Sequence, residues 1–264
     1  MRHIATFALF AAAALGANSP DPSPAQIEDI IAKFAAKEAE FARVRGNYTY
    51  RQTFKIQELD DSGTVTGKHE MVSDIIFTGE GKRTERVVYA PVSSLHALIM
   101  SSQDEQDLRD VQPFVLTTTE IPNYNIRYMG REQLDEIATY AFAVKPKKLD
   151  PGKRYFEGIV WVDDKDLQVV KTYGRGIGLL KKNEDQQFPK FETYREQIDG
   201  KYWFPTYTIA NDTLNFKDMS QRVRETVKYE DYKQFKADAV IKYDTEGADK
   251  TPPKTTPPPP KKQQ

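Results

Sequence analysis

The stretch RYFEGIVWVDDKDLQVVKTYG, residues 154–174, decides the fold that this sequence predicts. Two runs rich in apolar and aromatic residues flank the polar segment Asp163-Asp164-Lys165-Asp166. Asp and Lys at this density between two apolar runs are typical of a solvated turn that joins two antiparallel strands. The segment also lacks the D-x-[DN]-x-[DN]-G pattern and the distal Glu of a calcium loop, so we interpret it as a turn and not as a metal site.

The same strand-and-turn pattern continues on both sides of this hairpin. From Tyr48 to Ile56, aromatic and aliphatic residues alternate with polar ones, which is the period-two pattern of a strand. Met129-Gly130 and Asp199-Gly200 are among the turns predicted, and Asp-Gly is a strong hairpin signal. The sequence predicts about ten strands in one domain. Beyond the first, they cover residues 69–78, 83–89, 123–129, 132–144, 154–162, 168–173, 188–198, 202–210 and 221–229.

Two helical segments accompany the strands. Ser23-Pro24-Ala25-Gln26 is a capping box with Pro at the first helical position, and an amphipathic stripe follows as far as Gly46. A second helical segment is predicted over Ser93–Arg109. The predicted fold class is therefore mainly β (α+β). It is a curved antiparallel sheet or incomplete β-barrel with an N-terminal helix and an inserted helical lid segment over its concave face.

The concave face of such a sheet is the predicted ligand site, because an apolar concavity under a lid suits an apolar ligand. The chain has 14 Tyr and 14 Phe, many at alternating strand positions, and these either line a cavity or fill a core. The side chains expected to share the cavity wall and the lid are Tyr50, Phe54, Ile75, Phe77, Leu95, Leu98, Ile99, Tyr140, Phe142, Tyr155, Ile159 and Trp161.

Recognisable catalytic chemistry is missing from the sequence. Beyond the N-terminal segment the histidines are His69 and His96, and neither belongs to an H-E-x-x-H motif. The chain has no Cys and no G-x-S-x-G nucleophile motif. GRGIG at residues 174–178 lacks the glycine spacing of a phosphate loop and is interpreted as a strand connection. We therefore expect a protein that is not an enzyme, without catalytic residues, metal or cofactor.

The two ends of the chain predict an exported protein. Residues 1–19 have the basic start, apolar run and small residues of a signal peptide, which leaves residues 20–243 as the ligand-binding domain. Residues 244–264 are rich in Pro and Lys without a large apolar side chain, as in a disordered tail. We expect a periplasmic protein without a membrane anchor.

Charge and composition also restrict the partners. Lys and Arg number 38 against 39 Asp and Glu, and both signs are interspersed along the chain. Without a basic block, nucleic acid is not an expected partner, and we expect a monomer.

Three segments resemble the LolA/LolB-like superfamily, specifically outer-membrane lipoprotein-sorting proteins. They are YFEGIVWVDDKDLQVVKTYG (155–174), YAFAVKPKK (140–148) and FPKFETYREQIDGKYWFPTYT (188–208), within a resemblance that covers roughly residues 120–235. The resemblance implies a curved antiparallel sheet around a hydrophobic cavity that holds acyl chains of lipoproteins or lipids. It also implies envelope proteins as donor and acceptor. The alternative is a non-enzymatic cell-envelope scaffold or interaction module with a filled core and a Pro-rich interaction tail.

Overall fold

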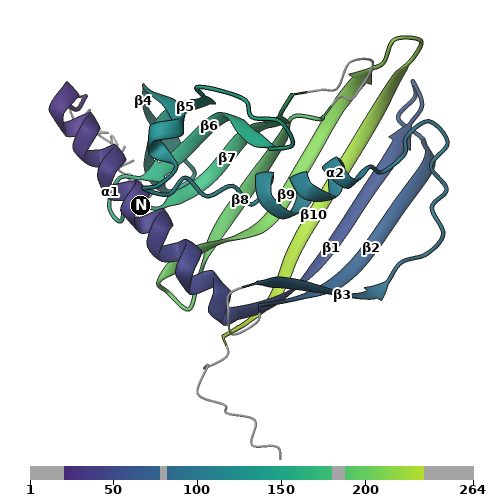
Figure 1. Ribbon diagram of the computed structural model, residues 1–264, viewed down its shortest axis with the longest axis horizontal. Coiled ribbons are helices and arrows are strands. Elements are labelled where there is room, and N and C mark those ends of the chain that lie inside the picture. The colour runs from purple at the N-terminus through teal and green to yellow at the C-terminus, as the bar shows by residue number, and fades with distance from the viewer. Residues whose placement is uncertain (1–20, 78–81, 180–187, 235–264) are drawn as a thin grey trace, which may run out of the picture.

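The computed structural model describes residues 21–77, 82–179 and 188–234. Ten strands form one antiparallel sheet in the order β3-β2-β1-β10-β9-β8-β7-β6-β5-β4 (Figure 1). The sheet does not close, because β3 and β4 each have a neighbour on one side only. These features confirm the predicted mainly-β class and the open, curved antiparallel sheet. The predicted signal peptide and Pro/Lys-rich tail lie outside the described residues.

Each predicted strand is present. The bounds of the strands are β1 Tyr48–Leu59, β2 Val65–Phe77, β3 Arg83–Tyr89, β4 Tyr124–Leu134, β5 Ile137–Pro146, β6 Tyr155–Asp163, β7 Val169–Ile177, β8 Phe191–Ile198, β9 Tyr202–Asn215 and β10 Ser220–Gln234. Strands β1, β2, β4, β7, β9 and β10 are longer than the sequence pattern predicts, whereas β5 and β8 are shorter.

The topology consists of two meanders that meet where β1 pairs with β10. Since β3 and β4 lie at opposite edges of the sheet, the connection between them, residues 90–123, has to cross from one edge to the other. This crossover connection carries α2 (Ser102–Gln106), the π-helical turn η2 (Asp107–Val111) and the short 3-10 helix η3 (Ile121–Asn123). Figure 1 shows α2 in front of the sheet, over β9 and β10.

The N-terminal helix α1 (Pro24–Val44) begins at the predicted capping box, where Ser23 Oγ accepts the Gln26 N–H and Gln26 Oε1 accepts the Ser23 N–H. Arg45–Asn47 (η1) follows it directly and leads into β1. The buried stripe of α1 packs on the sheet, and the rings of Phe34 on α1 and Phe142 on β5 lie 5.4 Å apart. The predicted helix and its apolar face are thus confirmed.

Three local predictions differ from the structure. Residues 93–101 form no helix, and the helical part of the crossover connection starts only at Ser102. Met129-Gly130 is not a turn but a bulge inside β4, where the register shifts and Gly130 has φ 128°, which favours glycine. GRGIG is not a connection, since Gly174–Ile177 belong to β7. Asp199 and Gly200 do form the predicted hairpin turn, with φ of 54° and 66°.

The acidic segment 163–166 is a turn in the structure. Asp163 Oδ1 accepts the N–H of Lys165 at 2.6 Å, and the Asp166 carboxylate accepts hydrogen bonds from Gln168 and Trp203. Within residues 21–77, 82–179 and 188–234, no group of three or more His, Asp or Glu side chains is placed to hold a metal ion. In the same part of the chain, no helix has the length and apolarity needed to span a membrane.

Candidate ligand-binding pocket

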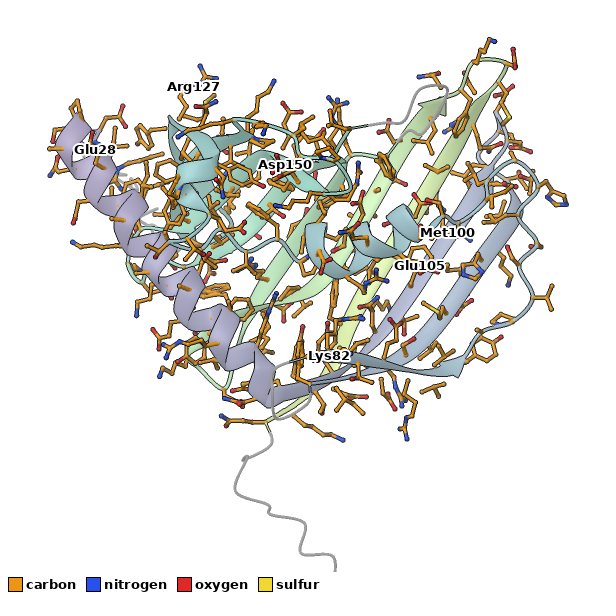
Figure 2. All side chains as sticks on the ribbon, in the orientation of Figure 1. Glu28, Lys82, Met100, Glu105, Arg127 and Asp150 are labelled. Atoms are coloured by element: carbon orange, nitrogen blue, oxygen red, sulfur yellow. The ribbon has the colours of Figure 1, made fainter. Side chains whose placement is uncertain are left out.

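A pocket of about 260 Å³ lies between the crossover connection and the sheet. Figure 2 places Met100 and Glu105 on the part of this connection that lies over the sheet. The aromatic and aliphatic side chains of the pocket come from three strands, the segment before β8, the turn after β9 and the connection itself. They are Phe54, Ile56, Leu98, Ile99, Met100, Leu108, Phe188, Phe191, Leu214 and Phe216. Ile99 lines the pocket although 91% of its surface is exposed, so an apolar ligand there would cover it.

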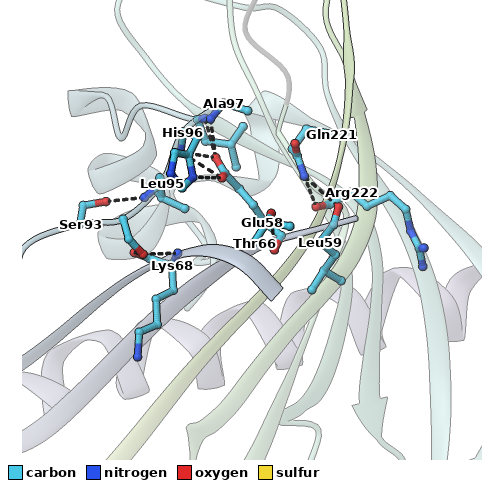
Figure 3. Close-up of polar contacts among 12 residues, drawn as sticks. Glu58, Leu59, Thr66, Lys68, Ser93, Leu95, His96, Ala97, Gln221 and Arg222 are labelled. Carbon is cyan, nitrogen blue, oxygen red and sulfur yellow. Dashed lines mark hydrogen bonds and ion pairs between the residues drawn. The ribbon is translucent and has the colours of Figure 1, made fainter. Parts of the chain in front are cut away.

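The lid of this pocket is residues 93–101 of the crossover connection, and β1 holds it through one carboxylate. Glu58 Oε1 accepts the backbone N–H groups of His96, Ala97 and Leu98 at 3.0, 2.7 and 2.8 Å (Figure 3). Burial raises the pKa of the Glu58 carboxyl, but these backbone hydrogen bonds outweigh it and leave the pKa below its ordinary value. Glu58 is therefore charged at neutral pH and fixes the lid next to the pocket.

Gly67 on β2 makes room for this contact. A Cβ at this position would lie 2.5 Å from Glu58 Oε2 and 2.6 Å from the carbonyl oxygen of Ser94. Glycine is therefore required here for the close approach of the lid to the sheet.

The floor of the pocket contains an acidic group within an apolar row of the sheet. Glu225 on β10 lies opposite Ile56 on one side and Ala210 on the other. Its carboxylate accepts a hydrogen bond from Gln112 Nε2, and both residues are buried. Burial raises the pKa of Glu225 to about 7 despite that hydrogen bond, and the nearby Asp104 and Asp107 add to the increase.

A buried ion pair lies beside this floor. Arg154 donates from Nε and Nη2 to the two oxygens of Asp107, at 2.8 and 2.6 Å, and both side chains are more than nine-tenths buried. Burial is also the main cause that raises the pKa of Asp107, and the guanidinium opposes it. The ion pair connects η2 of the crossover connection to the residue before β6 and so fixes the connection next to the sheet after the lid.

Only part of the predicted ligand-binding set lines this pocket. Phe54, Leu98 and Ile99 do, while Leu95 packs against the neighbouring cluster that contains Phe54. Tyr50 and Phe77 line a separate hollow of about 160 Å³. Ile75 is fully buried.

The remaining predicted residues lie elsewhere. Tyr140 and Phe142 belong to the closed core under α1, and Tyr155 packs at its margin and donates its hydroxyl to Asp150. Ile159 and Trp161 form a different cluster with Ala141 and Val170. Trp161 alternates along β6 with Val160 and Val162, which pack in the core under α1, so it lies on the opposite face of the sheet. The structure therefore does not bring all twelve side chains to one pocket.

Several residues that line the pocket were not predicted from the sequence to bind a ligand. Phe188 and Phe191 were predicted only as members of a strand, Leu214 lay beyond the predicted end of its strand, and Glu225 looked like an ordinary polar position of an alternating strand. One signal was available for Glu225. In QRVRETVKY it follows Val223 and precedes Val227 at period two, which places it on their buried face.

Comparison with known proteins finds similarity at the level of the fold. No family model matches the chain, and no curated protein matches it. A LolA superfamily protein from Nitrosomonas europaea is 13% identical over 78% of this chain and 94% of that chain, with a TM-score of 0.37. A DUF1329 family protein from Desulfovibrio piger is 15% identical over 76% and 93%, also with a TM-score of 0.37.

An outer membrane lipoprotein-sorting protein domain from Vibrio parahaemolyticus is 10% identical over 76% of this chain and 92% of that chain, with a TM-score of 0.34. The chain is thus similar to solved structures of the LolA superfamily and of the outer membrane lipoprotein-sorting type, the two groups that its hairpin region resembles.

Proposed function

We propose that this protein is a periplasmic carrier or chaperone that binds acyl chains of lipoproteins or lipids in the pocket beneath the lid. The observation that carries the proposal is the pocket itself. Aromatic and aliphatic side chains from the lid and the sheet surround a hollow of about 260 Å³. Pockets for small ligands are mostly apolar with a few polar groups, and this one has that character.

The proposed ligand enters past the lid. Leu98 and Ile99 belong to a segment without helix or strand, held next to the sheet by the Glu58 hydrogen bonds. Movement of this segment breaks no hydrogen bond between strands, but it breaks the hydrogen bonds to Glu58, while Ser94 at the start of the lid is hydrogen-bonded to Lys68 of β2. The sequence resemblance to lipoprotein-sorting proteins supports an acyl chain as the ligand.

Leu98→Glu tests the proposal, because a carboxylate in the pocket wall has to be desolvated when an apolar chain binds. We expect at least a roughly tenfold loss of affinity, about 1.4 kcal/mol, for a neutral long-chain alcohol labelled with pyrene. Val92→Glu is the matched control, because Val92 is 97% exposed on the same connection and does not line the pocket. A parent protein that never takes up the probe, or Leu98→Glu binding like the parent, would contradict the proposal.

The second candidate function is a cell-envelope scaffold, and the half of the sheet under α1 favours it. There Phe34, Phe142 and Val160 are fully buried in a closed core. Native mass spectrometry of gently purified protein distinguishes the two functions. A co-purified lipid supports the carrier, and an unliganded mass together with no probe binding supports the scaffold.

Export is part of the proposal and rests on residues 1–19. We expect the periplasmic fraction to contain a shortened, unlipidated chain by intact-mass measurement. The full-length chain in the cytoplasm would contradict it.

A further inference from the structure

The polar groups of the pocket are acidic, and this has a consequence for the ligand. Asp104, Asp107 and Glu225 line the pocket, whereas no Lys or Arg is among its lining residues in the described ranges. Arg154 lies behind Asp107 and engages both of its oxygens. Among described residues, neither Asp104 nor Glu225 forms an ion pair. Among the described residues, no cation therefore balances the carboxylates of Asp104 and Glu225.

Gln112 provides an independent indication of a missing hydrogen-bond donor. Its side chain is 4% exposed and lines the pocket, and its Nε2 donates to Glu225. Its Oε1 is buried and has no hydrogen-bond partner. A buried amide oxygen without a donor costs stability, and so does a buried carboxylate without a cation. Gln112 and Glu225 both line this pocket, so both destabilising groups belong to it.

An apolar side chain at position 225 would stabilise the fold more than the glutamate does. The cross-strand neighbours of Glu225 are Ile56 and Ala210, and the next positions on its face are Val223 and Val227. A carboxylate at such a site is typical of a functional group, since a hydrophobic side chain would pack there without a desolvation cost.

We propose that the pocket selects amphiphiles with a protonated amine, whose ammonium group binds Glu225, Gln112 Oε1 and Asp104 while the chain packs against Phe188, Phe191 and Leu214. This inference rests on the proposed function, because it specifies the head group of the ligand of the same pocket. An ammonium has three N–H donors and no acceptor, which matches a carboxylate, an orphan carbonyl oxygen and a second carboxylate. An anionic head would meet like charges and leave Gln112 Oε1 without a donor.

The test compares dodecylamine, dodecanol and dodecanoate as competitors of the neutral pyrene probe, below their aggregation concentrations. The assay is run at pH 8, where an amine with an ordinary pKa near ~10.4 is protonated. We expect dodecylamine to bind at least about tenfold more tightly than dodecanol, and dodecanoate more weakly than dodecanol. Glu225→Gln should remove most of the difference in affinity between dodecylamine and dodecanol, with Asp104 accounting for the remainder. Glu230→Gln, exposed on the same strand, should leave the ratio unchanged.

Asp104→Asn is the second variant, because Asp104 is only half-buried and an asparagine Oδ1 can still accept the hydrogen bonds that Asp104 Oδ2 accepts from the Ser101 N–H and hydroxyl. It should reduce the amine preference in part, even if Glu225→Gln does not fold. Equal binding of the three competitors by the parent overturns the inference but leaves the proposed function intact. Tighter binding of dodecanoate also overturns it, and would place the head group near Arg175 and Lys190, which line the adjoining hollow. If neither the probe nor any competitor binds, both proposals fail.

Discussion

At the scale of single residues, Phe142 shows how an aromatic side chain that looks like a cavity wall can be core. Its ring is fully buried against Phe34 of α1 and 5.6 Å from the ring of Tyr128. Phe142→Ala should therefore lower the free energy of unfolding by about 3–5 kcal/mol, as when a packed Phe is truncated. Denaturant unfolding measures this loss. Tyr89→Ala, at a side chain 53% exposed, is the control and should change stability by no more than about 0.5 kcal/mol. An equal loss in both variants would show that Phe142 is not packed.

Glu225 makes stability depend on pH. Its folded-state pKa is about 7, whereas the ordinary value is 4.5. Between these pH values the unfolded chain binds fewer protons than the folded one, so the free energy of unfolding falls as pH rises through this window. The loss contributed by this group is about 3 kcal/mol at most, is complete above the folded pKa and is absent below the unfolded pKa.

Glu225→Gln should remove that contribution. We expect the melting temperature of the parent to fall more steeply between pH 5 and pH 8 than that of the variant, measured by thermal unfolding at a series of pH values. Glu230→Gln is again the control, because its exposed carboxylate lies on the same strand. Parallel curves for the parent and Glu225→Gln would show that Glu225 has no raised pKa.

At the scale of secondary structure elements, a buried ion pair fastens α1 to the sheet. Arg195 Nη1 on β8 donates to Glu38 Oε1 at 2.9 Å, Nη2 donates to the carbonyl oxygen of Phe114, and both charged side chains are 1% exposed. Arg195→Met leaves the Glu38 charge buried and unpaired, which should cost about 3–5 kcal/mol of stability.

The matched variant is Glu38→Leu combined with Arg195→Met. It removes both charges, so it should recover much of the stability that the single change loses, as measured by urea unfolding. A double variant that is no more stable than Arg195→Met would show that the two charges do not act as a pair.

A second buried carboxylate, that of Glu58 on β1, holds the lid through hydrogen bonds to its backbone N–H groups. Glu58→Gln replaces one carboxylate oxygen by an NH2 group that cannot accept a lid N–H, and it removes the negative charge; hydrogen bonds to charged acceptors contribute about 1.5–3 kcal/mol each. We expect hydrogen exchange at residues 96–98 to accelerate at least about tenfold and probe association to become faster. Glu70→Gln on β2 is the control, because Glu70 pairs with Lys55 and does not contact the lid. Unchanged exchange would show that the hydrogen bonds to Glu58 do not hold the lid.

At the scale of the whole molecule, the inner face of the sheet has two halves. The half under α1 is closed by the packing of Phe34, Ile30 and Phe142, and the half under the lid retains a pocket of about 260 Å³. Stability therefore depends mainly on one half and the proposed binding on the other.

A ligand in the pocket contacts the lid, β1, β7, β8, β9 and β10 together, so it should stabilise the folded chain as a unit. With the probe at a hundred times its Kd, the free energy of unfolding should rise by about 2.7 kcal/mol. Thermal unfolding with and without the probe measures this change, and Leu98→Glu should show a smaller one. No change at concentrations that saturate the fluorescence signal would place the probe outside the pocket.

The sequence by itself determined the local elements of this protein. The capping box at Ser23, the period-two strands, the Asp163–Asp166 turn and the Asp199-Gly200 turn all follow from interactions between residues close in the chain. Alternation also indicated which residues of a strand share a face, such as Tyr140 and Phe142.

Only the tertiary structure decided which face of the sheet is covered and which segment of the chain covers it. The pairing of β1 with β10 sends residues 90–123 across the sheet, and no local pattern specifies a pairing between strands so far apart in sequence. That path places the lid over Phe54 and Glu225, leaves α1 over Phe142, and puts Trp161 on the opposite face. Whether an aromatic side chain fills a core or lines a pocket depends on the element packed against it, and that element comes from a distant part of the chain.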